Sequence, residues 1–171
     1  MTRTFDPAFH EKLLDLLAAS NYVPDYLEFC QAYSVQRDID GPRLNMAEAA
    51  EIFRSCGVSL DWDKKFKVFE FDHEEIGGWT WFGSLVVQRY DMLEPMIKGE
   101  DHKAGKSAGS TLLDIAIDAG ERRSPPIGIW APLPRPQFDG NMDTMRRMIP
   151  DLISLFRSIK DVLRRGWAPA T

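Results

Sequence analysis

The sequence predicts a single α+β domain of 171 residues, because three stretches with different hydrophobic patterns follow one another along the chain. Apolar residues recur at helical spacing over residues 1–60, residues 61–140 mix strand and helix patterns, and residues 141–166 carry one long helical stripe. We expect N-terminal helices, a small antiparallel sheet in the middle, and a long C-terminal helix packed on that sheet. A chain of this length buries enough surface to fold without a metal ion or a disulfide.

Helix start signals recur in the first 60 residues. Asp6 is a good N-cap, and Pro7 after it suits the first turn of a helix. Pro24 opens a second expected helix. Asn45, with a glutamate three residues later, forms a capping box in front of a third. Between the second and third helices, residues 35–44 are rich in turn residues and predict a loop.

The middle of the chain is rich in aromatic and β-branched residues. Residues 65–72 predict a strand that is bulged or buried on both faces, because its aromatic residues fall on both parities. Gly77 and Gly78 mark a turn, and residues 79–82 predict the returning strand. This part of the sequence therefore predicts a hairpin.

Residues 84–97 fit both a strand and a helix, and we favour a strand that gives way to a helix before Pro95. Residues 98–110 are polar and rich in glycine, so they predict a mobile loop. For residues 84–97, the alternation of hydrophobic residues is too short to decide between a strand and a helix.

Residues 110–119 also fit a strand or a helix, and a helix is favoured because Ser110 can cap it. Residues 127–130 are a strand candidate. The prolines that follow, up to Pro136, exclude a central strand in that stretch because proline donates no backbone hydrogen bond.

The C-terminal region carries the clearest pattern, a stripe of apolar residues that follows the expected N-cap Asn141. The stripe consists of Met142, Met145, Ile149, Leu152, Phe156, Ile159 and Leu163. Further apolar residues widen it, which favours packing on the sheet of the same chain, and a homodimer seam is the alternative. Pro150 is expected to kink this helix or to start it afresh.

Net charge is −5 and is unevenly distributed. Residues 1–75 hold 8 Lys and Arg against 15 Asp and Glu, whereas residues 76–171 hold 13 against 11. Binding to nucleic acid depends on clustered cations, so the acidic first half argues against a nucleic-acid ligand. It is compatible with a basic protein partner.

The two cysteines, Cys30 and Cys56, are expected to be free thiols beside apolar neighbours. The sequence shows no secretory signal and no apolar run long enough to span a bilayer. We therefore expect a cytoplasmic protein without a membrane partner.

No motif with catalytic specificity is present. Gly105-Lys106-Ser107 matches the end of a phosphate-binding loop, but Glu100 stands where such a loop needs its first glycine. Three histidines in the whole chain leave few candidates for base catalysis. We expect no catalytic, cofactor-binding or metal-ligating residues and no cofactor, and the residues match no family motif that we recognise.

The residues around the expected hairpin are the best candidates for a functional surface. The acidic ones are Asp61, Asp63, Asp72, Glu74 and Glu75. Trp79 and Trp81 share one strand face, where exposed tryptophans often anchor a partner protein; the alternative is that they fill the core of the domain. These seven residues are the predicted partner-binding set.

We therefore expect a non-catalytic protein-binding module that masks a partner with a basic surface, as small acidic immunity or antitoxin proteins of bacteria do. One alternative is a small metal-dependent hydrolase or nuclease that uses clustered carboxylates. A second alternative is an accessory subunit that forms a homodimer through its C-terminal helix.

Overall fold

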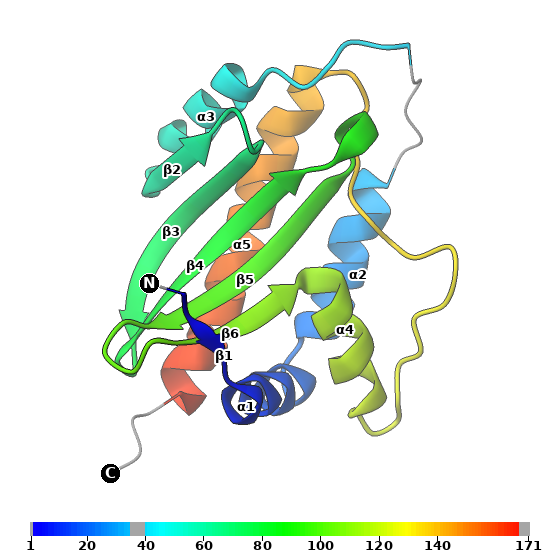
Figure 1. Cartoon of the computed structure of the whole chain (residues 1–171). Helices are drawn as coiled ribbons and strands as arrows, with labels where there is room; N and C mark the ends of the chain where they lie inside the picture. Colours follow the sequence, from blue (N-terminus) through cyan, green and yellow to red (C-terminus); the bar gives the residue numbers. More distant parts are fainter. Residues whose placement is uncertain (1, 35–39, 168–171) are drawn as a thin grey trace.

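The computed structural model describes residues 2–34 and 40–167 and shows an α+β fold, as predicted (Figure 1). Within these ranges the helices are α1 (Pro7–Ala18), α2 (Tyr22–Tyr33), α3 (Met46–Ser55), α4 (Leu112–Glu121), α5 (Met142–Gly166) and the 3-10 turn η1 (Arg89–Asp91). The strands are β1 (Thr4–Phe5), β2 (Leu60–Asp63), β3 (Val68–Ile76), β4 (Trp79–Val87), β5 (Leu93–Asp101) and β6 (Lys106–Thr111).

The strands of the described ranges form one mixed sheet in the order β1-β6-β5-β4-β3-β2. Strands β2 to β6 run antiparallel in sequence order, and the short β1 pairs parallel with β6. The predicted hairpin is confirmed, since β3 and β4 are joined at Gly77 and Gly78, both of which have positive φ. The sheet is larger than the sequence predicted, because β1, β2, β5 and β6 were not expected as strands.

Helix α5 packs on the sheet, as predicted. Its apolar stripe is buried, with Ile149, Phe156 and Leu163 at most 1% exposed. Phe156 meets the ring of Phe71 from β3 edge-on, at a centroid separation of 5.1 Å. The stripe is thus used inside the chain and is not exposed to a second copy. Pro150 lies within this helix, which continues through it rather than starting afresh.

The predicted N-caps are present. Asp6 accepts hydrogen bonds from the backbone N–H of Ala8 and Phe9, and Asn45 accepts one from Glu48. Helix α2 begins two residues before the expected start, so that its proline lies in the first turn. The predicted loop 35–44 falls partly on residues 35–39, which lie outside the described residues.

The prediction of a helix before Pro95 is wrong. Strand β4 continues to Val87, and after η1 the chain returns as β5, in which Pro95 lies opposite Leu85. Strand β6 begins to pair with β5 only at Met96. At Pro95 the strand therefore has a strand neighbour on one side only, a place where a missing backbone N–H is tolerated.

The prediction of a loop at residues 98–110 is also wrong, because these residues form the end of β5, a tight turn and most of β6. Residues 110–119 do form most of a helix, α4, although Thr111 rather than Ser110 caps it. The strand expected at residues 127–130 is wrong, since this stretch has no regular structure. No described helix is long and apolar enough to cross a membrane.

Candidate functional site

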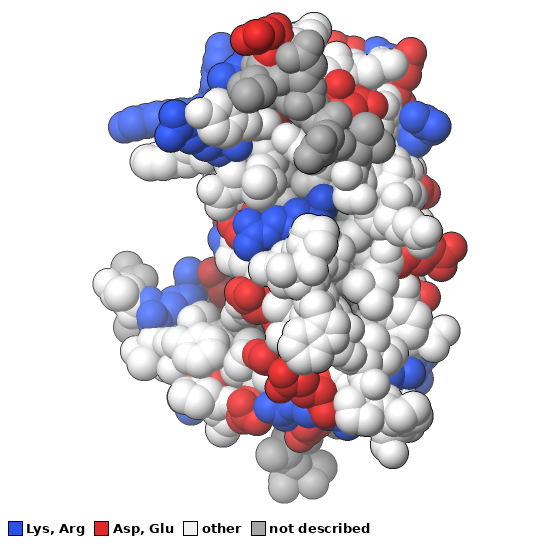
Figure 2. Space-filling model, turned by 90° about the vertical axis from the view of Figure 1, so that its right-hand side faces the viewer, with Lys and Arg blue, Asp and Glu red and all other residues white. Residues whose placement is uncertain are grey.

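One face of the sheet is covered by helices and the other is not. In Figure 1 no described helix crosses in front of β3, β4 and β5, and α5 runs behind them. Figure 2 shows the uncovered face edge-on at its left, where the outline of the molecule is hollowed between two projecting ends. We call the surface formed by the outward side chains of β2 to β6 the open face.

Strand alternation decides which residues belong to the open face, because successive side chains point to opposite sides of a sheet. Phe69, Trp81 and Leu85 are buried beneath the helices, so the residues of opposite parity point outward. The outward residues of β2 and β3 are Asp61, Asp63, Val68, Glu70, His73 and Glu75. Those of β4, β5 and β6 are Thr80, Phe82, Ser84, Val86, Glu94, Met96, Lys98, Glu100, Ser107, Gly109 and Thr111.

Carboxylates dominate the charge of the open face. They are Asp61, Asp63, Glu70, Glu75, Glu94 and Glu100. Among the residues in the described ranges, the cations that meet them on this face are Lys98, whose Nζ lies 3.2 Å from Glu70, and Arg3, which lies 3.0 Å from Glu100. The open face is therefore net acidic, and the lysines of the β2–β3 turn lie beyond one end of it.

The centre of the open face is held rigid by stacked side chains. The His73 ring stacks on Phe82 with a centroid separation of 4.7 Å, and Lys98 Nζ lies 5.9 Å from the centroid of the same ring. The backbone N–H of His73 donates to Ser59 Oγ at 2.9 Å. Phe82 is only 4% exposed although no helix covers it. Its neighbours therefore present a preformed surface, which lowers the entropic cost of binding.

A second series of contacts between side chains orders the end of the open face nearest β1. Thr80 donates to Glu75, and its Oγ1 lies 3.1 Å from His102 Nε2. His102 Nδ1 is 3.0 Å from the Arg3 guanidinium, which also pairs with Glu100. The side chains at this end border a depression of about 290 Å³. The centre of the open face and its end nearest β1 are thus ordered by side-chain contacts.

Ser84 lies in the middle of the open face, in register with Glu70 on one side and Met96 on the other. It is fully buried, and no group of the residues that the structure describes forms a hydrogen bond with its Oγ.

The structure divides the predicted acidic residues into two groups. Asp61, Asp63 and Glu75 lie on the open face, whereas Asp72 and Glu74 point to the other side, toward α5. The cause is the predicted bulge in β3, which shifts the register between Phe71 and Glu74 and gives Asp72 a positive φ. The five carboxylates therefore do not form one cluster.

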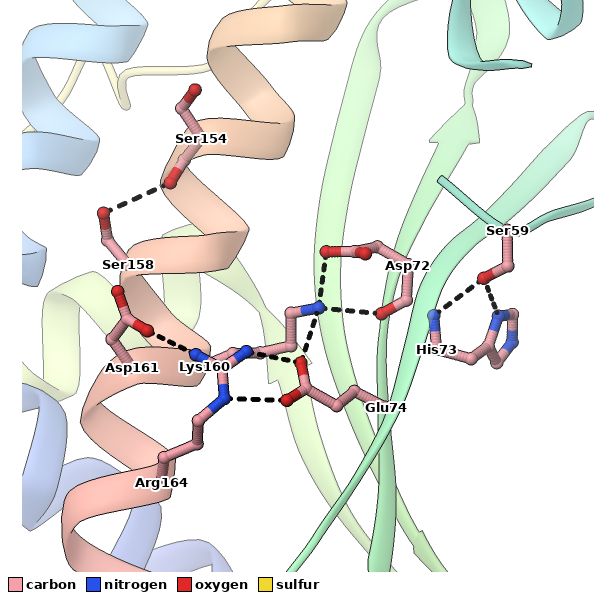
Figure 3. Close-up of polar contacts among 9 residues, drawn as sticks. All are labelled: Ser59, Asp72, His73, Glu74, Ser154, Ser158, Lys160, Asp161 and Arg164. Carbon is pink, nitrogen blue, oxygen red and sulfur yellow. Dashed lines mark hydrogen bonds and ion pairs between the residues drawn. The ribbon is translucent and has the colours of Figure 1, made fainter. Parts of the chain in front are cut away.

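Figure 3 shows how Asp72 and Glu74 are used. The ammonium group of Lys160 binds the backbone oxygen of Asp72 at 3.0 Å, the Asp72 carboxylate, and Glu74 Oε2 at 3.2 Å. Arg164 donates two hydrogen bonds to Glu74, at 2.7 and 2.6 Å. The Arg164 contacts are the main cause that lowers the pKa of Glu74. Asp72 and Glu74 therefore fasten α5 to β3.

The expectation that Trp79 and Trp81 are exposed is wrong. They are 3% and 0% exposed, and their rings pack against Trp167 at the end of α5. Large aromatic side chains on the helix-covered side of a sheet fill the core. Neither tryptophan is available at the surface as an anchor.

Sequence reasoning missed several open-face residues, of which Glu70, Glu94, Lys98 and Glu100 carry its charge. A signal for three of them was present, since Glu94, Lys98 and Glu100 fall on the same parity of this stretch, although Met96 interrupts the charged positions. The large aromatic side chains that are most exposed, Trp130 at 82% and Phe66 at 68%, were also missed as surface residues.

The geometry bears on the alternative of a metal-dependent hydrolase. Within the described part of the chain, no group of three or more His, Cys, Asp or Glu side chains is arranged to hold a metal ion. Asp72 and Glu74 both pair with Lys160, and Glu74 also pairs with Arg164, so these two carboxylates have cations of α5 as their partners. Comparison with protein-family models, curated protein sequences and solved structures returned no match for the chain.

Proposed function

We propose that the chain is a non-catalytic protein-binding module whose open face receives a basic surface of a partner protein. The observation that carries this proposal is a sheet face that no described helix covers and on which carboxylates outnumber cations. Like charges gathered on one surface repel one another, and a basic partner relieves that repulsion.

The rigidity of the open face supports protein binding by a preformed surface. His73 stacks on Phe82, Lys98 Nζ lies 5.9 Å from the centroid of the same ring, and the end nearest β1 is ordered by contacts between side chains. Such a surface binds with little loss of side-chain freedom. Masking a partner, as acidic immunity and antitoxin proteins do, requires this kind of extended and preformed contact.

The test uses two pairs of substitutions that change the net charge equally. Asp61→Asn with Glu75→Gln removes two carboxylates from the open face, and Asp118→Asn with Glu121→Gln removes two exposed carboxylates from α4. The tagged wild type and both variants are used to capture partners from a lysate of the source organism, and the captured proteins are quantified by mass spectrometry.

We expect a stoichiometric, salt-sensitive partner that the open-face variant retains less well than the α4 variant does. With the purified partner, the open-face variant should associate more slowly, and its association rate should depend less on salt. Equal affinities and equal salt dependence for the two variants would exclude the open face as the binding surface.

A further inference from the structure

A groove runs between α2 and α5 on the side of the helices that faces away from the sheet. Two adjoining cavities of about 280 and 350 Å³ form it, and both are lined by Asp25, Leu155 and Ser158. Along α5 the lining extends from Asp151 to Arg165, a length of about 21 Å at 1.5 Å per residue. The groove is therefore about as long as four turns of a helix.

Small side chains keep the groove open. Ala32 on α2 and Ser154 and Ser158 on α5 line it, and each of them is exposed. Ser154 and Ser158 are one turn apart on α5, so no long side chain crosses the groove between them. The apolar part of its floor is supplied by Leu155, which is 6% exposed, and by half-buried Val162.

Carboxylates border the groove on both helices. They are Asp25 and Glu28 on α2 and Asp151 and Asp161 on α5. Asp151 accepts a hydrogen bond from the hydroxyl of Tyr33, and burial is the main cause that raises the pKa of this tyrosine to about 12. Asp161 pairs with Arg164, and Arg165 lines one end of the groove. The borders are therefore net acidic above an apolar floor.

We propose that this groove binds a basic amphipathic helix of a partner protein. A third helix placed along α2 and α5 would set its apolar side on Leu155 and Val162 and its Lys or Arg side chains against Asp25, Glu28 and Asp151. Acidic borders exclude nucleic acid and anionic lipid as occupants, because both carry negative charge. The groove lies on the opposite side of the molecule from the open face, so this inference does not depend on the proposed function.

The experiment uses a fluorescein-labelled peptide of 15 residues, with leucine on one helical face and lysine elsewhere, and a matched peptide with glutamate in place of lysine. Binding to the full chain is measured by fluorescence anisotropy at low and at physiological salt. We expect saturable binding of the lysine peptide that weakens with salt, and no binding of the glutamate peptide. Amide shifts in NMR spectra should then map to Ser154, Ser158 and Ala32.

Variants locate the peptide. Ser158→Trp fills the groove and should weaken binding at least tenfold, whereas Gln31→Trp, exposed on α2 outside the lining, should leave it unchanged. Asp25→Asn with Glu28→Gln should weaken binding roughly threefold to tenfold, because two exposed ion pairs are lost. Ala32→Arg adds a positive charge at the other end of the groove, which should repel the lysine peptide, and it serves if Ser158→Trp does not fold.

The outcomes separate this groove from the open face. The pair Asp61→Asn and Glu75→Gln should leave peptide binding unchanged. Absence of saturable binding would overturn the proposal. Equal binding by the Ser158→Trp or Ala32→Arg variant and the wild type, or amide shifts confined to the open face, would overturn it as well.

Discussion

Replacing Lys160 by methionine removes a buried charge while keeping most of the side-chain volume. The Lys160 side chain is 3% exposed, and its ammonium group binds Asp72 twice and Glu74 once. Breaking a buried pair by removing one partner costs about 3–5 kcal/mol. Glu74 keeps both hydrogen bonds from Arg164, and the Asp72 side chain is 18% exposed to water. We therefore expect a loss of about 2–3 kcal/mol, at or just below the lower end of that range.

The free energy of unfolding is measured by urea titration with tryptophan fluorescence as the signal. Arg164→Met is the matched comparison: its side chain is 44% exposed, so its removal should cost less than about 1 kcal/mol. In the Lys160→Met background, Asp72→Asn should recover part of the loss, because the unpaired carboxylate is then gone. The reasoning is refuted if Lys160→Met unfolds within about 0.5 kcal/mol of the wild type, or if both single substitutions cost the same.

Three further outcomes follow from burial and charge. Trp81→Ala should destabilise the fold by about 3–5 kcal/mol because its ring is fully buried, whereas Trp130→Ala should stay within about 0.5 kcal/mol in the same urea assay. Alkylation followed by mass spectrometry should label half-buried Cys56 before Cys30, since burial raises the Cys30 pKa to about 11 and keeps it a buried thiol. The pKa of Glu74 is lowered in the folded state, so ionised Glu74 stabilises the fold fully when the pH is above the ordinary glutamate pKa. This stabilisation is lost as the pH falls through the lowered pKa. Glu74→Gln should therefore make the free energy of unfolding depend less on pH in acid.

Sequence patterns predicted the elements that local rules control. Asp6 and Asn141 cap helices through their own side chains, and the two glycines after β3 supply positive φ at a turn. The stripe on α5 repeats often enough to indicate both the helix and its buried side. These features depend on neighbours within one or two turns, which a single sequence contains.

Strand β6 and the end of β5 could not be predicted in this way. Their composition is that of a loop, and they are strands because β4 offers backbone groups to pair with. Gly99 illustrates the cause, since a Cβ added there would lie 2.6 Å from the ring of Trp81. The glycine that resembles a loop residue in the sequence is required by a tryptophan on the neighbouring strand.

The candidate site was predicted only in part, for a related reason. Asp72, Glu74 and Glu75 are close in sequence, yet the bulge in β3 directs the first two toward α5 and the third to the open face. Glu70 and Glu100 are 30 residues apart, and only the strand register brings them to the same surface. Register depends on pairing between distant segments, which the spacing of residues along one strand does not reveal.

The two groups of carboxylates have different physical roles, and this difference is the strongest argument for the open face. Asp72 and Glu74 are matched by Lys160 and Arg164, so their charges are accounted for by the attachment of α5. On the open face, by contrast, the carboxylates exceed the cations that meet them, so folding gains little from the excess and pays for the repulsion among like charges. A surplus of charge that folding does not use, on a preformed surface that no described helix covers, supports a partner of opposite charge.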